Sequence, residues 1–274
     1  MTHAYPLADA ALAQRLEGVA TIDMAGYVDA GRVSGMYPDA TTLRVGGGVA
    51  ACISPDNVVN GSVGLGMTGP VAVEEIDRLI EFFETRGSVP IVEVCPLADP
   101  TLTDALARRG FRVSAFEAEL YQPLPALRQK RPSPGVRVRM AKTKADRATW
   151  AELAARGFSS DRPTEADHLV SRTVSSRMDA LHFIGYLDGE PAGTGMLYIA
   201  EGLARFGGDA TLPAMRGRGV QSAILAARLR MAARAGCDLA VIGASPGSTS
   251  QRNQERAGFR VAYTRVTFVR AVQP

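Results

Sequence analysis

Residues 210–225, "ATLPAMRGRGVQSAIL", place an Arg-Gly-Arg-Gly run between an apolar, strand-like stretch and a segment with helical spacing. A glycine turn that opens a helix points several free backbone N–H groups at one spot, which attracts an anion. Gly217 and Gly219 carry no Cβ that would block this approach. Arg216 and Arg218 add charge suited to phosphate oxygens. Two readings stay open for the turn alone: an anion-binding loop, or a solvated basic turn that only starts a helix.

The composition is that of an ordinary globular protein. The chain has 274 residues, of which 46% are hydrophobic and 22% charged, enough for one large domain or two of ordinary size. Its net charge of +3 is too small to predict a nucleic-acid or membrane-surface partner. No apolar run is long enough to cross a bilayer, and residues 1–18 lack the pattern of an export signal. We therefore expect a cytoplasmic protein.

The cysteines and histidines are scattered along the chain. Cys52, Cys95 and Cys237 form no CxxC pair, which is typical of a reducing compartment and disfavours a disulfide framework or a zinc site. The three histidines are equally far apart. We therefore expect no metal site.

The two halves of the chain repeat one another. The sequence GFRV occurs at Gly110–Val113 and again at Gly258–Val261. In each half, a helix-like segment ends at a glycine, Gly87 or Gly236, and a short strand, a short helix and a final strand follow in the same order. The shared order and spacing predict two copies of one fold.

A linker is predicted between the two copies. Residues 123–136, "PLPALRQKRPSPGV", combine four prolines with three charges, which disfavours helix and sheet. We therefore expect two domains, about 1–125 and 136–274.

The second half leads up to the turn through three predicted strands. Asp188-Gly189 is a strong hairpin signal, and the following Pro191 predicts a loop slightly longer than two residues. A third strand follows residues 201–202 and runs into the turn. The helix after it has an apolar stripe, Val220, Ile224, Ala227 and Met231, with the arginines at 228, 230 and 234 largely off the stripe.

Common nucleotide-binding loops fit this turn badly, because no Gly-Lys-Ser/Thr is present and no GxGxxG follows a first parallel strand. The turn resembles instead that of the GNAT superfamily of N-acyltransferases, Arg/Gln-x-x-Gly-x-Gly/Ala between the fourth strand and the third helix. Here it runs from Arg216 to Gln221, and Gln221 stands where the family has a small residue. "STSQRNQERAGF", 248–259, resembles the family's other signature, a short helix ending in Gly-Phe. The resemblance implies an α/β fold with a mixed sheet, and the repeat implies two such domains in tandem.

The resemblance also implies acetyl-CoA as co-substrate and a set of residues that contact it. The backbone of Thr211 and Leu212 is implied to lie along the pantetheine arm, with the Leu212 N–H polarising the thioester carbonyl. Asn253, on the later short helix, is also assigned to the cofactor. The implied pyrophosphate contacts are Arg216, Gly217, Arg218, Gly219, Val220, Gln221 and Ser222.

The implied reaction is direct attack of an amine on the thioester. Many members of the family protonate the departing thiolate with a tyrosine, but that position here is Gln254, which cannot act as an acid. Asp209 is the candidate general base, and its alternative role is a solvated carboxylate at a strand end. Tyr198 and Tyr263 are weaker candidates, since such tyrosines are more often half-buried strand residues.

The first half lacks the anion turn. Its corresponding segment, 67–73, reads "MTGPVAV", with one glycine, no arginine, and a proline that has no N–H to donate. We expect this copy to have lost CoA binding, which leaves one cofactor per chain.

The leading functional hypothesis is an N-acetyltransferase that acts on a primary amine of a small molecule. The alternative is a non-catalytic acyl-CoA-binding or sensing protein, which Gln254 favours. A nucleic-acid-binding protein is disfavoured by the slight charge and the lack of a basic-aromatic stripe. The sequence leaves the acceptor and the oligomeric state open.

Overall fold

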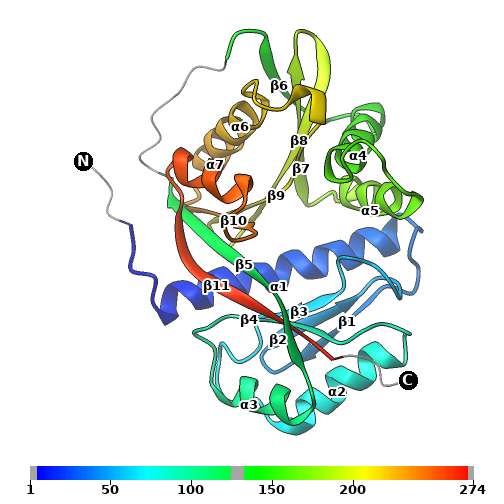
Figure 1. The fold of residues 1–274 in the computed structure, drawn as a ribbon, viewed down its shortest axis with the longest axis vertical. Helices are drawn as coiled ribbons and strands as arrows, with labels where there is room; N and C mark the ends of the chain where they lie inside the picture. Colours follow the sequence, from blue (N-terminus) through cyan, green and yellow to red (C-terminus); the bar gives the residue numbers. More distant parts are fainter. Residues whose placement is uncertain (1–4, 125–132, 271–274) are drawn as a thin grey trace. The chain divides into compact units, whose positions relative to one another are not determined.

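The computed structural model describes residues 5–124 and 133–270 (Figure 1). The chain divides into two compact units, each of which is described on its own. Unit 1 is made mainly of Tyr121–Ile242. Unit 2 combines Pro6–Leu120 with Gly243–Glu255 and Phe259–Pro274.

These units differ from the two segments expected from the sequence. Most of the expected linker falls on residues 125–132, which lie outside the described residues. Most of the chain after residue 242 belongs to unit 2, because β11 (Arg260–Val269) pairs antiparallel with β4 (Ile91–Val94). The division into 1–125 and 136–274 therefore stays a prediction about the repeated sequence, while β11 of the second copy belongs to unit 2.

Unit 1 contains a five-strand section of sheet in the order β10-β9-β8-β7-β6. Its antiparallel strands are β6 (Val136–Met140), β7 (Ala180–Leu187), β8 (Glu190–Ala200) and β9 (Leu203–Thr211), and β10 (Leu239–Ala244) joins β9 in parallel. One face is covered by α6 (Val220–Arg234) and the other by α4 (Lys144–Phe158), against which α5 (Glu165–Ser176) packs (Figure 1). The predicted run of three antiparallel strands into the turn is confirmed.

The hairpin between β7 and β8 differs in detail from its prediction. Leu187 pairs with Glu190, so Asp188-Gly189 forms a two-residue loop, and the longer loop expected from Pro191 is wrong. Both loop residues have positive φ, +52° and +95°, as a tight hairpin turn requires. Pro191 of β8 pairs with Tyr186, and the register of β7 and β8 shifts between Gly185 and Tyr186.

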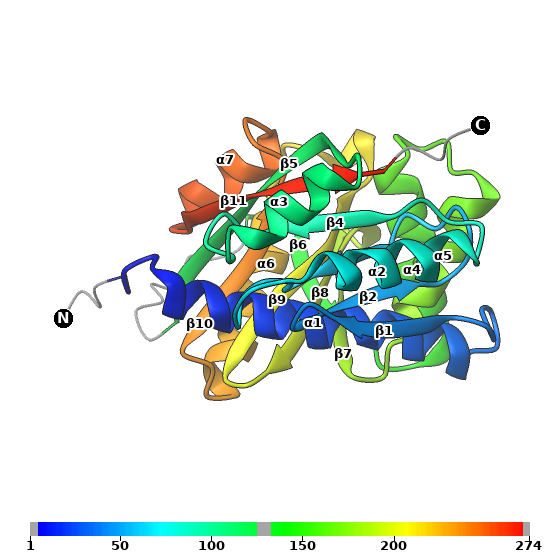
Figure 2. The same cartoon turned by 90° about the horizontal axis from the view of Figure 1, so that it is seen from below.

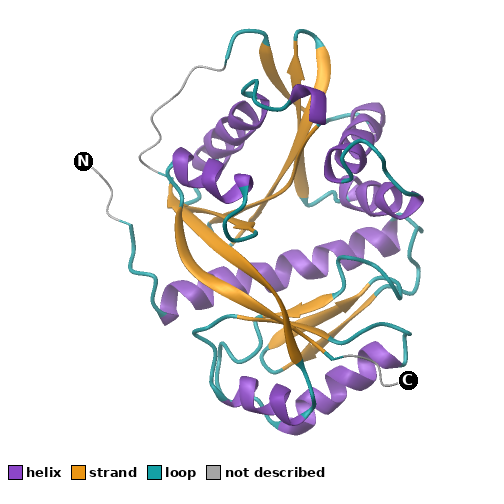
Figure 3. Cartoon of the chain, in the orientation of Figure 1, coloured by secondary structure: helices purple, strands orange, loops and turns teal. Residues whose placement is uncertain are grey.

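Unit 2 holds a three-stranded sheet, β1-β2-β3, and a second section in the order β4-β11-β5. Figure 2 shows α1 beside the strands of the first sheet, and Figure 3 separates helices from strands in the same fold. Among the described residues, no helix is both long and apolar enough to cross a membrane. The bounds not yet given are α1 (Ala10–Val33), β1 (Thr41–Val45), β2 (Gly48–Cys52), β3 (Gly61–Val63), α2 (Val73–Glu84), α3 (Thr101–Arg108), β5 (Arg112–Pro123) and α7 (Thr249–Ala257).

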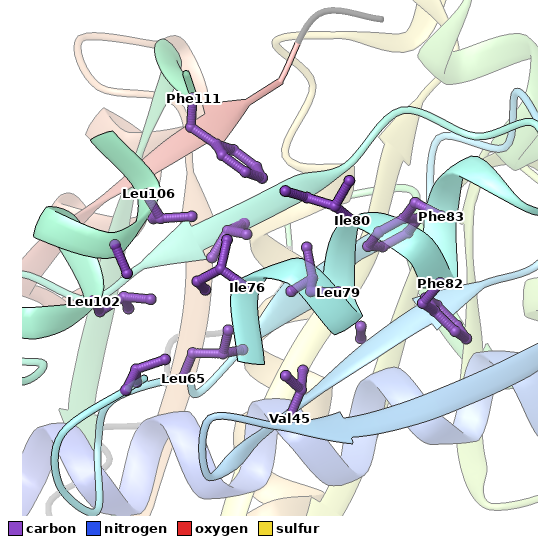
Figure 4. Close-up of a cluster of buried hydrophobic side chains, with 14 of the residues drawn as sticks. Val45, Leu65, Ile76, Leu79, Ile80, Phe82, Phe83, Leu102, Leu106 and Phe111 are labelled. Atoms are coloured by element: carbon purple, nitrogen blue, oxygen red, sulfur yellow. The ribbon is translucent and has the colours of Figure 1, made fainter. Parts of the chain in front are cut away.

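A large apolar core of unit 2 forms where α2 and α3 pack on strands (Figure 4). Ile76, Leu79 and Phe83 of α2 are fully buried, at the spacing of one helical face. Leu102 and Leu106 of α3 are equally buried, four residues apart. This burial is the main stabilising contribution of the two helices.

The predicted repeat of elements is confirmed. The order α2-β4-α3-β5 of the first half recurs as α6-β10-α7-β11 in the second. Gly87 and Gly236, which follow α2 and α6, have φ of +65° and +80°. Gly110 and Gly258, which open the two GFRV segments, have φ of +74° and +106°. Because glycine adopts these angles at little cost, both copies change direction at matching points.

A charged cluster is buried inside unit 2. The Arg265 guanidinium donates to Glu17 at 2.8 Å and lies 3.1 Å from a carboxylate oxygen of Glu119. The hydroxyl of Tyr263 also donates to Glu17, at 2.7 Å. Burial raises the pKa of Tyr263, so this tyrosine is a core residue, in agreement with the alternative considered for it.

Candidate functional site

The Arg-Gly-Arg-Gly turn joins β9 to α6 within unit 1. Gly217 and Gly219 have φ of +74° and +85°, where side-chain-bearing residues are strained. No side chain caps α6 at Gly219, and its first turn holds no acidic residue. Since the Ala223 N–H is the one that reaches back to the Gly219 carbonyl, the N–H groups of residues 220–222 have no acceptor within the helix. Within the part of the chain that the structure describes, the turn therefore presents unused donors at the positive end of a helix.

The two arginines of the turn differ in their surroundings. The Arg216 guanidinium donates to the carbonyls of Thr211 and Gly157, both at 3.1 Å, so it braces the end of β9 against the end of α4. Arg218 is exposed and lies 2.9 Å from Asp188. Arg216 thus has a structural function beside its predicted cofactor contact.

One edge of β9 is left without a strand before β9 ends. Parallel pairing with β10 stops at Phe206, although β9 continues to Thr211. On the opposite side, the Leu212 N–H donates to the Ala192 carbonyl at 3.0 Å, so this predicted polariser is already engaged. Thr211 is paired with Gly193, and alternation along an antiparallel strand turns the Thr211 N–H away from β8. Thr211 therefore has a backbone N–H that points away from β8, whereas that of Leu212 is engaged; which of the two polarises the thioester stays a prediction.

Asp209 is held by two side chains of α6. Its carboxylate accepts from both terminal nitrogens of the Arg228 guanidinium, one at 2.9 Å, and from the Gln221 side-chain amide. The side chain is only 15% exposed, so the alternative of a solvated carboxylate is wrong. Three hydrogen bonds and this low exposure leave little of the carboxylate available to an acceptor amine. The assignment of Asp209 as a general base stays a prediction, in competition with a structural role.

Arg228 is the residue of this region that the sequence analysis missed. It was expected to lie largely off the apolar face of α6, but it is fully buried. Its guanidinium donates to the carbonyls of Met196 and Gly207, at 3.0 and 3.2 Å, and lies 4.7 Å from the ring centre of Phe206. Gly195 makes room for it, because a Cβ there would be 2.9 Å from the guanidinium carbon. A glycine inside a strand was the available signal for such a close approach.

The corresponding helix start in unit 2 is occupied by the protein's own side chains. The Glu75 carboxylate accepts from the N–H groups of Gly46 and Ala72, at 2.8 and 3.3 Å. The Thr101 hydroxyl oxygen accepts from the Val71 N–H at 2.8 Å. Two glutamates stand in the first turn of α2. Negative charge and occupied donors both disfavour an anion at this position.

The remaining candidates lie on α7 and β8. Ser248 caps α7 by accepting from the Gln251 N–H at 3.1 Å. On the same helix Asn253 is exposed, whereas Gln254 is 2% exposed and its side-chain oxygen has no hydrogen-bond partner among the described residues. Tyr198 is buried on β8 with the Arg177 guanidinium 4.8 Å from its ring centre, as expected of a core tyrosine.

Comparisons with known proteins agree with this arrangement. Residues 147–259 match the Acetyltransferase (GNAT) family. No curated protein is similar enough to the chain to count as a match.

Solved structures share the fold at low sequence identity. A GCN5-related N-acetyltransferase from Kribbella flavida matches with a TM-score of 0.67 at 17% identity, over 91% of this chain and 96% of the other. A tandem GNAT protein from the clavulanic acid biosynthesis pathway matches with a TM-score of 0.58 at 14% identity, over 92% and 95%. A GCN5-related N-acetyltransferase from Sphaerobacter thermophilus matches with a TM-score of 0.59 at 18% identity, over 73% and 68%. The expected α/β fold of tandem GNAT type is therefore confirmed.

Proposed function

We propose that residues 147–259, which match the Acetyltransferase (GNAT) family, act as an acyl-CoA-dependent N-acyltransferase. The proposed reaction transfers an acetyl group from acetyl-CoA to a primary amine of a small molecule. The observation that carries this proposal is the uncapped start of α6 behind its glycine turn. A Cβ at Gly217 would have no described residue within 4 Å, so the backbone there is open to a phosphate group. The residues present therefore fit the pyrophosphate of CoA.

Each part of the site has a proposed role toward the cofactor. The N–H groups of residues 217–222 bind the pyrophosphate, the Ser222 hydroxyl adds a donor, and Arg218 adds charge. The backbone of Thr211 and Leu212 lies along the pantetheine arm, with the Thr211 N–H as the donor toward the acyl carbonyl. Asn253 is retained as a further cofactor contact. Bound acetyl-CoA supplies the activated acyl group.

The proposed transfer needs few protein groups. The amine nitrogen forms a bond to the acyl carbon, the carbon–sulfur bond breaks, and CoA leaves as the thiolate. The amine must lose one proton, for which Asp209 stays the predicted acceptor and solvent is the alternative. Gln254 cannot return a proton to sulfur, so we propose departure of the thiolate without a dedicated protein acid.

One cofactor per chain follows from the contrast between the two helix starts. The start of α6 has unused N–H groups and no acidic residue, whereas at α2 Glu75 and Thr101 already accept hydrogen bonds from backbone N–H groups near the helix start. Unit 2 is therefore proposed to have a structural or substrate-binding function. The cytoplasmic location stays a prediction.

The competing candidate is a non-catalytic acyl-CoA sensor, which the buried, non-acidic Gln254 favours. Such a sensor would bind acyl-CoA at the same turn and would differ from the enzyme only in transferring no acyl group. The discriminating assay combines the full chain, acetyl-CoA and a panel of polyamines, aminoglycosides, amino acids and peptides. Thiol release is measured, and the amines are examined by mass spectrometry.

We expect at least one small amine to raise thiol release above the amine-free rate and to appear in acetylated form. Heat-treated protein and reactions without amine are the controls. Binding of acetyl-CoA with no acetylated amine across the panel would favour the sensor and contradict the enzyme.

A further inference from the structure

The end of β9 contains a bulge that side chains fix from both faces of the sheet. The pairing of β8 with β9 shifts register between Thr194 and Met196, opposite the segment around Gly208. Gly208 has φ of +62°, and its carbonyl accepts from the Thr194 hydroxyl at 2.8 Å. A Cβ at Gly208 would lie 2.7 Å from the indole of Trp150, so α4 packs directly on the bulge. The conformation of this segment is therefore tightly determined.

Arg228 holds the same segment from the α6 side. Its guanidinium binds the carbonyls of Met196 and Gly207 and the carboxylate of Asp209. The buried guanidinium needs the opposite charge of Asp209, and the two carbonyls fix its orientation. Asp209 and Arg228 therefore act together on the backbone that leads to Thr211.

Gln221 connects this segment to the glycine turn. It is the second residue of α6, and its side-chain amide donates to Asp209. Its side-chain oxygen accepts from the Thr211 hydroxyl at 3.3 Å. A small residue at this position, as in the family pattern, could make neither contact. One side chain of the phosphate-binding turn thus contacts two residues at the end of β9.

We propose that Gln221, Asp209 and Arg228 are positioning residues that couple the phosphate-binding turn to the end of β9. Binding of the pyrophosphate at the turn then fixes the position from which the Thr211 N–H donates a hydrogen bond to the acyl carbonyl. This inference rests on the proposed function. A misplacement of about 1 Å between reacting groups can cost about a hundredfold in rate, so a link of this kind has a measurable effect.

The test compares wild type with Gln221→Ala, using acetyl-CoA that carries ¹³C at the carbonyl. Isotope-edited infrared spectroscopy reports hydrogen bonding to that carbonyl, and calorimetry reports affinity. We expect Gln221→Ala to keep acetyl-CoA affinity within about threefold, while the carbonyl stretch returns toward its value in free solution. Arg234→Met, at an exposed position of α6, is the control and should leave both measurements unchanged.

Acetyl-pantetheine separates coupling from a merely structural effect, because this donor lacks the pyrophosphate. On an amine accepted by the wild type, Gln221→Ala should lower kcat with acetyl-CoA by about tenfold and change turnover of acetyl-pantetheine by less than about twofold. Equal losses with both donors, or an unchanged carbonyl stretch, would overturn the coupling. A wild type that binds no acetyl-CoA would overturn the proposed function itself, which is a distinguishable result.

Asp209→Asn is a second test variant, because asparagine has nearly the same shape as aspartate. If Asp209 acts by positioning, this variant should reproduce the altered carbonyl stretch of Gln221→Ala. An Asp209→Asn protein with an unchanged stretch, but with a loss of rate for both donors that grows at low pH, would assign Asp209 to proton transfer instead.

Discussion

Replacing Arg265 with methionine should lower the free energy of unfolding by about 3–5 kcal/mol, because it leaves buried carboxylates without their cation. Glu17 and Glu119 are 1% and 0% exposed, and both lie within 3.1 Å of the Arg265 guanidinium. Each carboxylate would lose its compensating charge while remaining inside unit 2. Urea unfolding followed by circular dichroism measures the change.

Two further variants test whether the loss of stability in Arg265→Met comes from the unpaired buried carboxylates. Arg112→Met changes an exposed arginine of β5 and should alter stability by no more than about 0.5 kcal/mol. Adding Glu17→Gln and Glu119→Gln to Arg265→Met removes the unpaired charges and should recover part of the loss. An Arg265→Met protein as stable as wild type would show that the cluster does not contribute as its geometry indicates.

Gly217→Asp should weaken acetyl-CoA binding by about a hundredfold, since it places a carboxylate beside the phosphate-binding N–H groups. The matched control is Gly217→Asn, which has nearly the same shape and no charge. Both Asp and Asn tolerate positive φ better than other side chains, and the site of a Cβ at Gly217 is open. Calorimetry should therefore separate the two variants by charge alone, with Gly217→Asn near wild type.

Equal affinities of the Asp and Asn variants would mean that no anion binds at the turn. Gly219 is a less suitable position for this test. A Cβ there would lie 2.3 Å from the Ser133 hydroxyl oxygen, so any substitution also disturbs packing.

Local signals predicted the fold well because they act over short distances along the chain. Gly87 and Gly236 end helices through their own positive φ, and apolar spacing on α2 determines its buried face. The assignment of β11 to unit 2 was not predictable in this way. It depends on pairing with β4, which lies far away in the sequence, and nothing local in β11 specifies that partner.

The candidate site was predicted in part. The glycine turn and the helix start behind it follow from residue types alone, whereas the loss of CoA binding by the first copy stays a prediction. The bulge near Gly208 and the hydrogen bond from the Leu212 N–H to Ala192 were not visible in the sequence, so Thr211 was not considered as the donor that is now proposed. Arg228 was missed because helical periodicity treats an arginine as a surface residue, whereas Gly195 and Asp209 allow it to be buried.

Calorimetric titration of the full chain with acetyl-CoA tests most directly whether the second copy alone binds the cofactor. The start of α6 has no side-chain cap, whereas Glu75 accepts hydrogen bonds from backbone N–H groups at the start of α2. This contrast predicts one acetyl-CoA per chain. Two acetyl-CoA molecules per chain, or no binding at all, would contradict the account.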